Sequence, residues 1–264
     1  MIEEKREKWL VSYPDDGNSV CFEMEDMSFW YQHRNGCLVE AMKANGFPKD
    51  FLDIGGGNGI TALAMQNAGY NVTLVEPYAT GIENARKRGI RSTVQNTLEE
   101  YVAKVNGTAP AAGFFDVMEH ISDDKSFLEN INRLLTPDGR IMLTVPAFQS
   151  LWSENDVQLG HFRRYTLEQL SALLAEAGFK VTYATYFFSL VWAPMWFARV
   201  LPEKFGIKKD NTPEKKRNEH MAGRPATARL LRRLLGWEVN AIRSRKRIPF
   251  GTSCLIVAQK TRGL

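Results

Sequence analysis

The chain has 264 residues, of which 44% are hydrophobic and 24% are charged, and its formal net charge is +4. These proportions are typical of a soluble globular protein, and they exclude a disordered, collagen-like or disulfide-scaffolded chain. The three cysteines, Cys21, Cys37 and Cys254, show no metal-ligand spacing with the four histidines. We therefore expect no disulfide framework, no metal site and a cytoplasmic location.

The first 50 residues contain no long apolar run. They open with MIEEKREKWL, which carries charges of both signs, and this composition is unlike that of an export signal. We expect residues 1–50 to form an N-terminal helical cap.

Short apolar runs alternate with helical patterns through the middle of the chain. Helical stretches separate strand-like runs at residues 51–54, 71–76, 111–115 and 140–146. This alternation predicts βαβ units and a parallel sheet. Thr166 and Gln169 have the spacing of a capping box, which predicts that a helix begins there.

The alternation breaks after a further strand-like run at residues 179–188. An apolar stretch, a basic linker and an amphipathic helical pattern follow, and the last strand-like run lies at 252–260. We therefore expect a core domain over residues 51–188, a helical insertion over 189–248, and the final strand of the core over 249–264.

The apolar stretch Tyr183–Leu201 is the one part of the sequence that could enter a membrane. Pro194, near its centre, and the polar Thr185 and Ser189 weaken a helix that would span the lipid. We expect a strand followed by a buried helix, with contact at the membrane surface as the alternative.

Positive charge is concentrated in residues 203–247, which hold 14 lysines and arginines against 5 aspartates and glutamates. The rest of the chain holds 20 and 25 of these residues, so a basic segment is attached to an acidic body. Such a segment either forms a solvated face or binds an anionic partner.

A glycine-rich turn, FLDIGGGNG at residues 51–59, joins a strand that contains Asp53 to a helix. Glycines let a ligand approach the backbone, and a helix N-terminus offers unpaired N–H groups; the alternative is a tight turn without a ligand. Ile60 stands where the dinucleotide pattern GxGxxG needs its third glycine. Glu76 ends the next strand, where an acid can bind both ribose hydroxyls. The pattern favours an adenosine over a pyrophosphate.

The segment FFDVMEHISDD, residues 114–124, resembles the D-V-L-E-H motif of a broad family of class I S-adenosylmethionine-dependent methyltransferases. LLTPDGRIMLTVPA at 134–147 and LWSENDVQLGHFRRYTLEQL at 151–170 extend the resemblance to about residues 28–190. It implies S-adenosyl-L-methionine as the cofactor. It also implies an α/β fold, a three-layer αβα sandwich with a mostly parallel seven-stranded sheet, an antiparallel last strand and a helical insertion before that strand.

The resemblance further implies which residues surround the cofactor. In the family these positions contact its methionine part, ribose and adenine, and form the floor beneath its sulfonium. Arg34 could pair with the cofactor's carboxylate, whereas Trp30 and its neighbour could equally be core residues. The cofactor-binding candidates are Tyr31, Arg34, Asp53, Gly55, Gly57, Glu76, Pro77, Asn96, Thr97, Leu98, Phe115, Asp116 and Val117.

The chain departs from the family pattern at three positions. Gly56 and Asn58 replace other small residues in the turn, and both remain compatible with it. Pro110 stands where an acidic residue often opens the fourth strand, so we expect that strand to start late.

Methyl transfer to a hydroxyl requires a nucleophile in line with the carbon–sulfur bond and a group that removes its proton. We expect Asp156 to orient His161, and His120 to act as a base, a helix cap or a cofactor contact. The catalytic candidates are His120, His161 and Asp156. We expect one of two adjacent arginines to bind an anionic substrate group and the other to form a structural ion pair. The substrate-binding candidates are Arg163, Arg164 and Tyr165.

The expected function is methyl transfer to a small-molecule or lipid-linked acceptor, at oxygen. Residues 183–247 would form a lid or touch the inner face of the membrane. The alternatives are a non-catalytic protein that binds S-adenosylmethionine or S-adenosylhomocysteine, a nucleic-acid methyltransferase that uses the basic insertion, and a nicotinamide oxidoreductase. The absence of a recognisable nucleic-acid-binding motif disfavours the second, and the GxGxG spacing disfavours the third.

Overall fold

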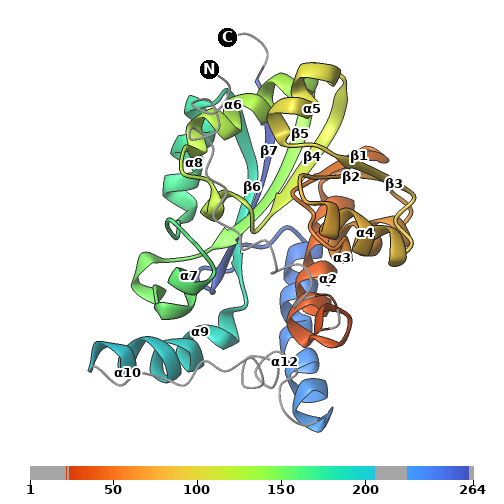
Figure 1. Ribbon diagram of the computed structural model, residues 1–264. Helices are drawn as coiled ribbons and strands as arrows, with labels where there is room; N and C mark the ends of the chain where they lie inside the picture. The colour runs from red at the N-terminus through yellow and green to blue at the C-terminus, as the bar shows by residue number, and fades with distance from the viewer. Residues whose placement is uncertain (1–21, 23, 206–224, 262–264) are drawn as a thin grey trace.

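A seven-stranded sheet forms the centre of the protein (Figure 1). The computed structural model describes residues 22, 24–205 and 225–261. The strands lie in the order β3-β2-β1-β4-β5-β7-β6. Their bounds are β1 Asp50–Ile54, β2 Asn71–Glu76, β3 Ser92–Gln95, β4 Ala109–Phe115, β5 Leu135–Pro146, β6 Phe179–Phe187 and β7 Ser253–Lys260.

The sheet is parallel from β3 to β5, and β7 runs antiparallel to both of its neighbours, β5 and β6. The predicted mostly parallel sheet with an antiparallel last strand is therefore confirmed. Because the carboxyl ends of parallel strands meet at one edge, that edge is where an open α/β sheet binds its ligands.

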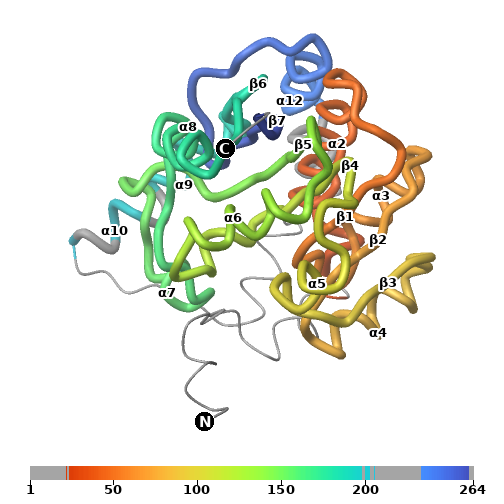
Figure 2. Tube along the Cα trace, turned by 90° about the horizontal axis from the view of Figure 1, so that it is seen from above, coloured from red at the N-terminus to blue at the C-terminus, as the bar shows by residue number. Residues whose placement is uncertain are grey.

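Helices cover both faces of the sheet and give the predicted three layers. Figure 2 shows α2 and α12 together on one side of the strands and α6 on the other. One face packs against α2 (Phe29–Ala44), α3 (Ile60–Asn67), α4 (Ala79–Lys87) and α12 (Pro225–Arg243). The other packs against α5 (Leu98–Val105), α6 (Asp124–Leu134) and α8 (Leu167–Glu176).

Local sequence signals fix where two of these helices begin. The predicted capping box of Thr166 and Gln169 is confirmed at the start of α8. A second box, formed by Thr97 and Glu100, starts α5. Each box satisfies two backbone N–H groups that the first helical turn would otherwise leave unpaired.

The prediction that the fourth strand starts late is wrong. β4 begins at Ala109, which pairs with Leu135. Pro110 has no N–H to donate to the ladder, and the register between β4 and β5 shifts between Ala109 and Ala111. An irregularity at this point lets the strand contain a proline.

The insertion leaves the sheet after β6 as α9 (Ser189–Met195), the π-helical turn η4 (Trp196–Val200) and α10 (Leu201–Lys204). Of the predicted strand and buried helix over Tyr183–Leu201, the strand is confirmed as the end of β6. The helix is not buried throughout, since Leu190 and Phe197 are 44% and 62% exposed; Phe205, after α10, is 75% exposed. In Figure 1 these helices extend away from the sheet.

Two parts of the predicted insertion and cap lie outside the described residues, namely 1–21 with Cys21 and 206–224 with much of the basic segment. Within the described ranges, no helix combines the length and the apolar character needed to cross a membrane.

Candidate active site

The glycine-rich turn follows β1 directly and leads into α3. Gly55 has a φ of +68°, and a Cβ there would lie 2.9 Å from a methyl of Val117. A Cβ on Gly56 would lie 2.6 Å from Oδ2 of Asp53. The turn therefore needs glycine at both positions, because one approaches the loop after β4 and the other a carboxylate.

Asp53 is fully buried beneath this turn. Neither of its carboxylate oxygens has a hydrogen-bond partner among the described residues. Burial raises the pKa of Asp53 to about 7, opposed by the charge of Arg34 and reinforced by that of Glu76. A buried carboxylate without donors is costly for a chain to keep, so this group is available for a ligand that brings a donor or a positive charge.

Glu76 ends β2 beside the same turn and is also buried. Its two oxygens accept hydrogen bonds from the backbone N–H groups of Gly57, at 3.0 Å, and Tyr78, at 3.2 Å. Burial raises the pKa of Glu76 to about 7, although both hydrogen bonds oppose the rise. Pro77, next along, accepts a hydrogen bond at its carbonyl from the side chain of Gln95.

Arg34 reaches this edge of the sheet from α2. Its guanidinium forms an ion pair with Asp116 and donates to the hydroxyl of Thr61 at 2.7 Å. The same group lies over the rings of Trp30 and Tyr31, 4.9 and 5.1 Å from their centroids. The structure thus assigns Trp30 and Tyr31 a role in holding Arg34, and pairing of Arg34 with a cofactor carboxylate stays a prediction.

The end of β4 forms the opposite wall. Asp116 has a φ of +56°, an unfavourable conformation for a residue other than glycine. Thr144 holds its carboxylate through a hydrogen bond of 3.2 Å. Phe115 stacks on Phe51 with 6.5 Å between ring centroids. The strained aspartate is stabilised from two sides, by Arg34 and by β5.

The turn between β3 and α5 contains three further candidates. Asn96 donates to the carboxylate of Glu100, Thr97 caps α5 and Leu98 is buried. Capping of the helix accounts for the side chains of Asn96 and Thr97, so their contact with an adenine stays a prediction.

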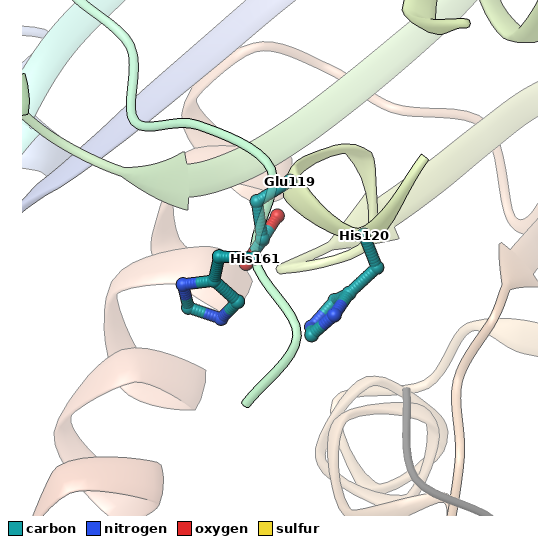
Figure 3. A group of neighbouring side chains, drawn as sticks. All are labelled: Glu119, His120 and His161. Carbon is teal, nitrogen blue, oxygen red and sulfur yellow. The ribbon is translucent and has the colours of Figure 1, made fainter. Parts of the chain in front are cut away.

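Glu119, His120 and His161 form a compact group (Figure 3). Two come from the turn η2 (Met118–His120) and one from the loop after α7 (Glu154–Gln158). Their potential ligand atoms lie within 4.8 Å of one another. Two imidazole nitrogens and one carboxylate oxygen are donors that a divalent transition metal accepts, although the sequence spacing predicted no metal site.

Burial dominates the electrostatics of this group. Burial and the negative charge of Asp116 raise the pKa of Glu119 well above its ordinary value, and its carboxylate oxygens have no partner within the part of the chain described. Burial, with the neighbouring His161, lowers the pKa of His120 to about 3. His120 is therefore neutral near pH 7.

Asp156 lies behind His161, as the sequence predicted. Its carboxylate accepts from Nδ1 of His161 at 2.9 Å and from Arg164 at 2.8 and 3.0 Å. Burial acts to raise the pKa of Asp156, but the hydrogen bonds from His161 and Arg164 outweigh it and hold the pKa below its ordinary value. The bond at Nδ1 leaves Nε2 of His161 for the site.

A family model described as a methyltransferase domain matches residues 31–184 of this chain. The chain belongs to this methyltransferase family. It is 39% identical over 109 residues to a ubiquinone biosynthesis O-methyltransferase of Actinobacillus pleuropneumoniae serotype 7, a match that covers 37% of this chain and 46% of the relative. The chain spans somewhat under half the length of the curated relatives it matches.

Solved structures agree on the fold. A methyltransferase dependent on S-adenosylmethionine (SAM), from Archaeoglobus fulgidus, is 19% identical with a TM-score of 0.52, covering 84% of this chain and 93% of that one. Phosphoethanolamine N-methyltransferase 2 of Haemonchus contortus, solved with S-adenosyl-L-methionine, is 18% identical with a TM-score of 0.56, covering 95% and 58%. The chain thus has the fold of the class I methyltransferases, and one of these similar structures contains S-adenosyl-L-methionine.

The residues at this edge fit that cofactor. The buried carboxylate of Asp53, which has no partner among the described residues, suits a ligand with donors, and the turn leads into the N-terminus of α3, where backbone N–H groups can bind a ligand. Glu76 presents a second carboxylate at the end of the next strand, where a ribose can be bound.

Of the predicted substrate contacts of the methyltransferase, two are buried in its framework. Arg164 pairs with Asp156, and Tyr165 hydrogen-bonds Asp124 with its ring buried. Arg164 thus forms the structural ion pair predicted for one of the two adjacent arginines, and a substrate contact of Arg164 or Tyr165 stays a prediction. Arg163 keeps a third of its side chain exposed while it pairs with Asp124 at 2.8 Å.

Sequence reasoning missed three contributors. Glu119 lies within the segment 114–124, but no role in the site was assigned to it from the sequence. A glutamate in that motif was a usable signal. Thr61 and Thr144, which hold Arg34 and Asp116, carry no local signal, because their partners lie on other elements.

Proposed function

We propose that the protein transfers a methyl group from S-adenosylmethionine to an oxygen of a small-molecule acceptor. The observation that carries this proposal is the Asp156–His161 pair, which lies with the glycine-rich turn at the carboxyl edge of the sheet. The similarity to ubiquinone biosynthesis O-methyltransferases supports oxygen as the methylated atom. The bound cofactor supplies an electrophilic methyl group on a positively charged sulfur.

The cofactor site in this proposal comprises the turn and the ends of the first four strands. Asp53 and Glu76 act through their carboxylates, and Arg34 through its guanidinium. The remaining members, carried over from the family pattern, are Tyr31, Gly55, Gly57, Pro77, Asn96, Thr97, Leu98, Phe115, Asp116 and Val117.

The proton of the acceptor hydroxyl passes to Nε2 of His161 in this proposal. The carboxylate of Asp156 at Nδ1 fixes the tautomer and stabilises the imidazolium that forms. His120 is the weaker candidate, because a pKa of about 3 gives its imidazole little affinity for a proton. We assign His120 to packing against His161, with ring centroids 4.8 Å apart.

Two features support an apolar or lipid-linked acceptor. Leu190 on α9, Phe197 on η4 and Phe205, which follows α10, are exposed apolar side chains. The segment 203–247 is strongly basic. Apolar side chains beside positive charge suit the surface of an anionic membrane. Residues 183–187 belong to the buried strand β6. We propose that the part of residues 183–247 that follows β6 touches the inner membrane face and that the protein is otherwise cytoplasmic.

Two experiments test these proposals. The purified chain should convert SAM to S-adenosylhomocysteine when it is mixed with phenols, quinol precursors or sugars. Cofactor binding without turnover on any acceptor would indicate a non-catalytic binder. Turnover on RNA or DNA alone would indicate a nucleic-acid methyltransferase. Anionic liposomes should carry the protein upward on flotation at low salt, and Phe197→Ser with Phe205→Ser should reduce this. Equal flotation with neutral liposomes, or none, would refute the membrane contact.

A further inference from the structure

A single buried carboxylate joins the insertion to the core. Glu238, on α12, is completely buried. It accepts hydrogen bonds from Nε2 of His33 at 2.8 Å, from the N–H of Phe188 at 2.9 Å, and from the N–H and hydroxyl of Ser189 at 2.7 and 2.5 Å. Three segments that are far apart in the sequence therefore meet at one side chain.

The contacts of Glu238 compensate for its burial. Burial acts to raise the pKa of Glu238, but the hydrogen bonds from His33 and Ser189 outweigh it and lower the pKa. The same bonds cap the first turn of α9, where Phe188 has a φ of +58°. A residue held in this strained conformation needs surrounding contacts to keep it there, and Glu238 supplies the one at its N–H.

Contacts continue from this carboxylate to the cofactor site. The ring of Phe188 stacks on Trp30, with centroids 5.3 Å apart and an angle of 4° between the planes. Trp30 lies under the guanidinium of Arg34, which pairs with Asp116 at the end of β4. Because Phe188 packs on Trp30 and Trp30 packs on Arg34, a shift at the start of α9 changes how the guanidinium of Arg34 is held.

We propose that Glu238 is a positioning residue that couples the start of the insertion to cofactor affinity. It holds α9 and α2 in the arrangement in which Arg34 reaches the site, and this rests on the proposed contact of Arg34 with the cofactor. Coupling of this kind is reciprocal. A ligand in the cofactor site therefore stabilises the first turn of α9.

Glu40 offers a matched control. It lies on α2 and accepts from Arg243 of α12 at 2.7 Å, so it joins the same two helices. The side chain of Arg243 is 59% exposed, and none of the contacts of Glu40 reaches Phe188 or Ser189. Glu40→Gln breaks a bridge between α2 and α12 without touching the proposed coupling.

The test measures binding of S-adenosylhomocysteine to the full chain by calorimetry, and hydrogen exchange over residues 188–195 with and without the ligand. Glu238→Gln replaces one carboxylate oxygen with an NH2 group, which faces the hydrogen-bond donors of His33, Phe188 and Ser189. This variant should bind S-adenosylhomocysteine about tenfold more weakly. It should also show no ligand-induced slowing of hydrogen exchange. Glu40→Gln should leave both unchanged. Equal affinity of Glu238→Gln and the wild type, with faster exchange, would overturn the coupling and leave a structural cap.

A milder variant covers the case in which Glu238→Gln does not fold. Ser189→Ala removes the hydroxyl donor but keeps the charge of Glu238, so it should weaken binding in the same direction by a smaller factor. Unchanged affinity and unchanged ligand-induced slowing in Ser189→Ala would overturn the proposal. Failure of the wild-type chain to bind S-adenosylhomocysteine would instead refute the proposed cofactor site.

Discussion

Replacing Asp53 with asparagine should stabilise the ligand-free protein, increasingly so as the pH rises. Burial raises the pKa of Asp53 from 3.8 to about 7, so the folded chain binds this proton roughly a thousandfold more tightly than the unfolded chain. The folded state is therefore favoured below pH 3.8, and this advantage is lost as the pH rises to about 7. Each tenfold difference is worth about 1.4 kcal/mol, which makes the full penalty about 4 kcal/mol above pH 7.

Asparagine has nearly the same shape and no charge, so Asp53→Asn avoids this penalty. Relative to the wild type, its free energy of unfolding should rise by roughly 3 kcal/mol between pH 5 and pH 8.5. Any cost of burying the amide adds a constant that does not depend on pH. Urea unfolding of both proteins at the two pH values, without ligand, measures the difference.

Asp50→Asn is the control, because that carboxylate is exposed at the start of the same strand. Its stability relative to the wild type should change little between the two pH values. A difference between Asp53→Asn and the wild type that stays constant from pH 5 to pH 8.5 would refute the reasoning. The same variant should bind S-adenosylhomocysteine more weakly, since a functional charge is often kept at the expense of stability.

His161→Gln should lower turnover about 100-fold and leave the calorimetric affinity for S-adenosylhomocysteine unchanged; an unchanged rate would remove His161 from the mechanism. EDTA should not alter the wild-type rate, and a loss restored by a divalent cation would assign the group of Glu119, His120 and His161 to a metal. Arg164→Ala should destabilise the fold by about 3–5 kcal/mol in urea unfolding, because it leaves Asp156 buried without its main partner. Arg163→Ala, at a partly exposed pair, should cost less than about 1 kcal/mol, and equal losses would contradict the buried role of Arg164.

The elements of the sheet were predictable because their signals are local. The runs at 51–54 and 71–76 matched β1 and β2 closely, and Thr166 marked the start of α8. Apolar alternation and capping chemistry act over a few residues, so they can be read in a single sequence. The start of β4 was misjudged because the effect of Pro110 depends on its pairing with β5.

The parts of the site formed by residues close together in the sequence could be predicted. The parts formed by residues from distant segments could be predicted less well. The turn after Asp53 and the acid at Glu76 stand at strand ends that the sequence located. The pairing of Asp156 with His161 spans five residues and was also foreseen. The sequence left open which of the two adjacent arginines forms the structural ion pair. Burial distinguishes Arg164 from Arg163, and burial is set by the packed fold.

The sequence by itself determined the α/β architecture, the glycine-rich turn and the concentration of positive charge in 203–247. Only the tertiary structure decided that Glu119 and His120 meet His161, that Leu190 and Phe197 after β6 are exposed, and that Glu238 joins His33 to the start of α9. Periodicity and turn chemistry describe neighbours along the chain. A buried carboxylate acquires its partners from segments as much as 205 residues apart, and the packing of helices against the sheet brings those segments together.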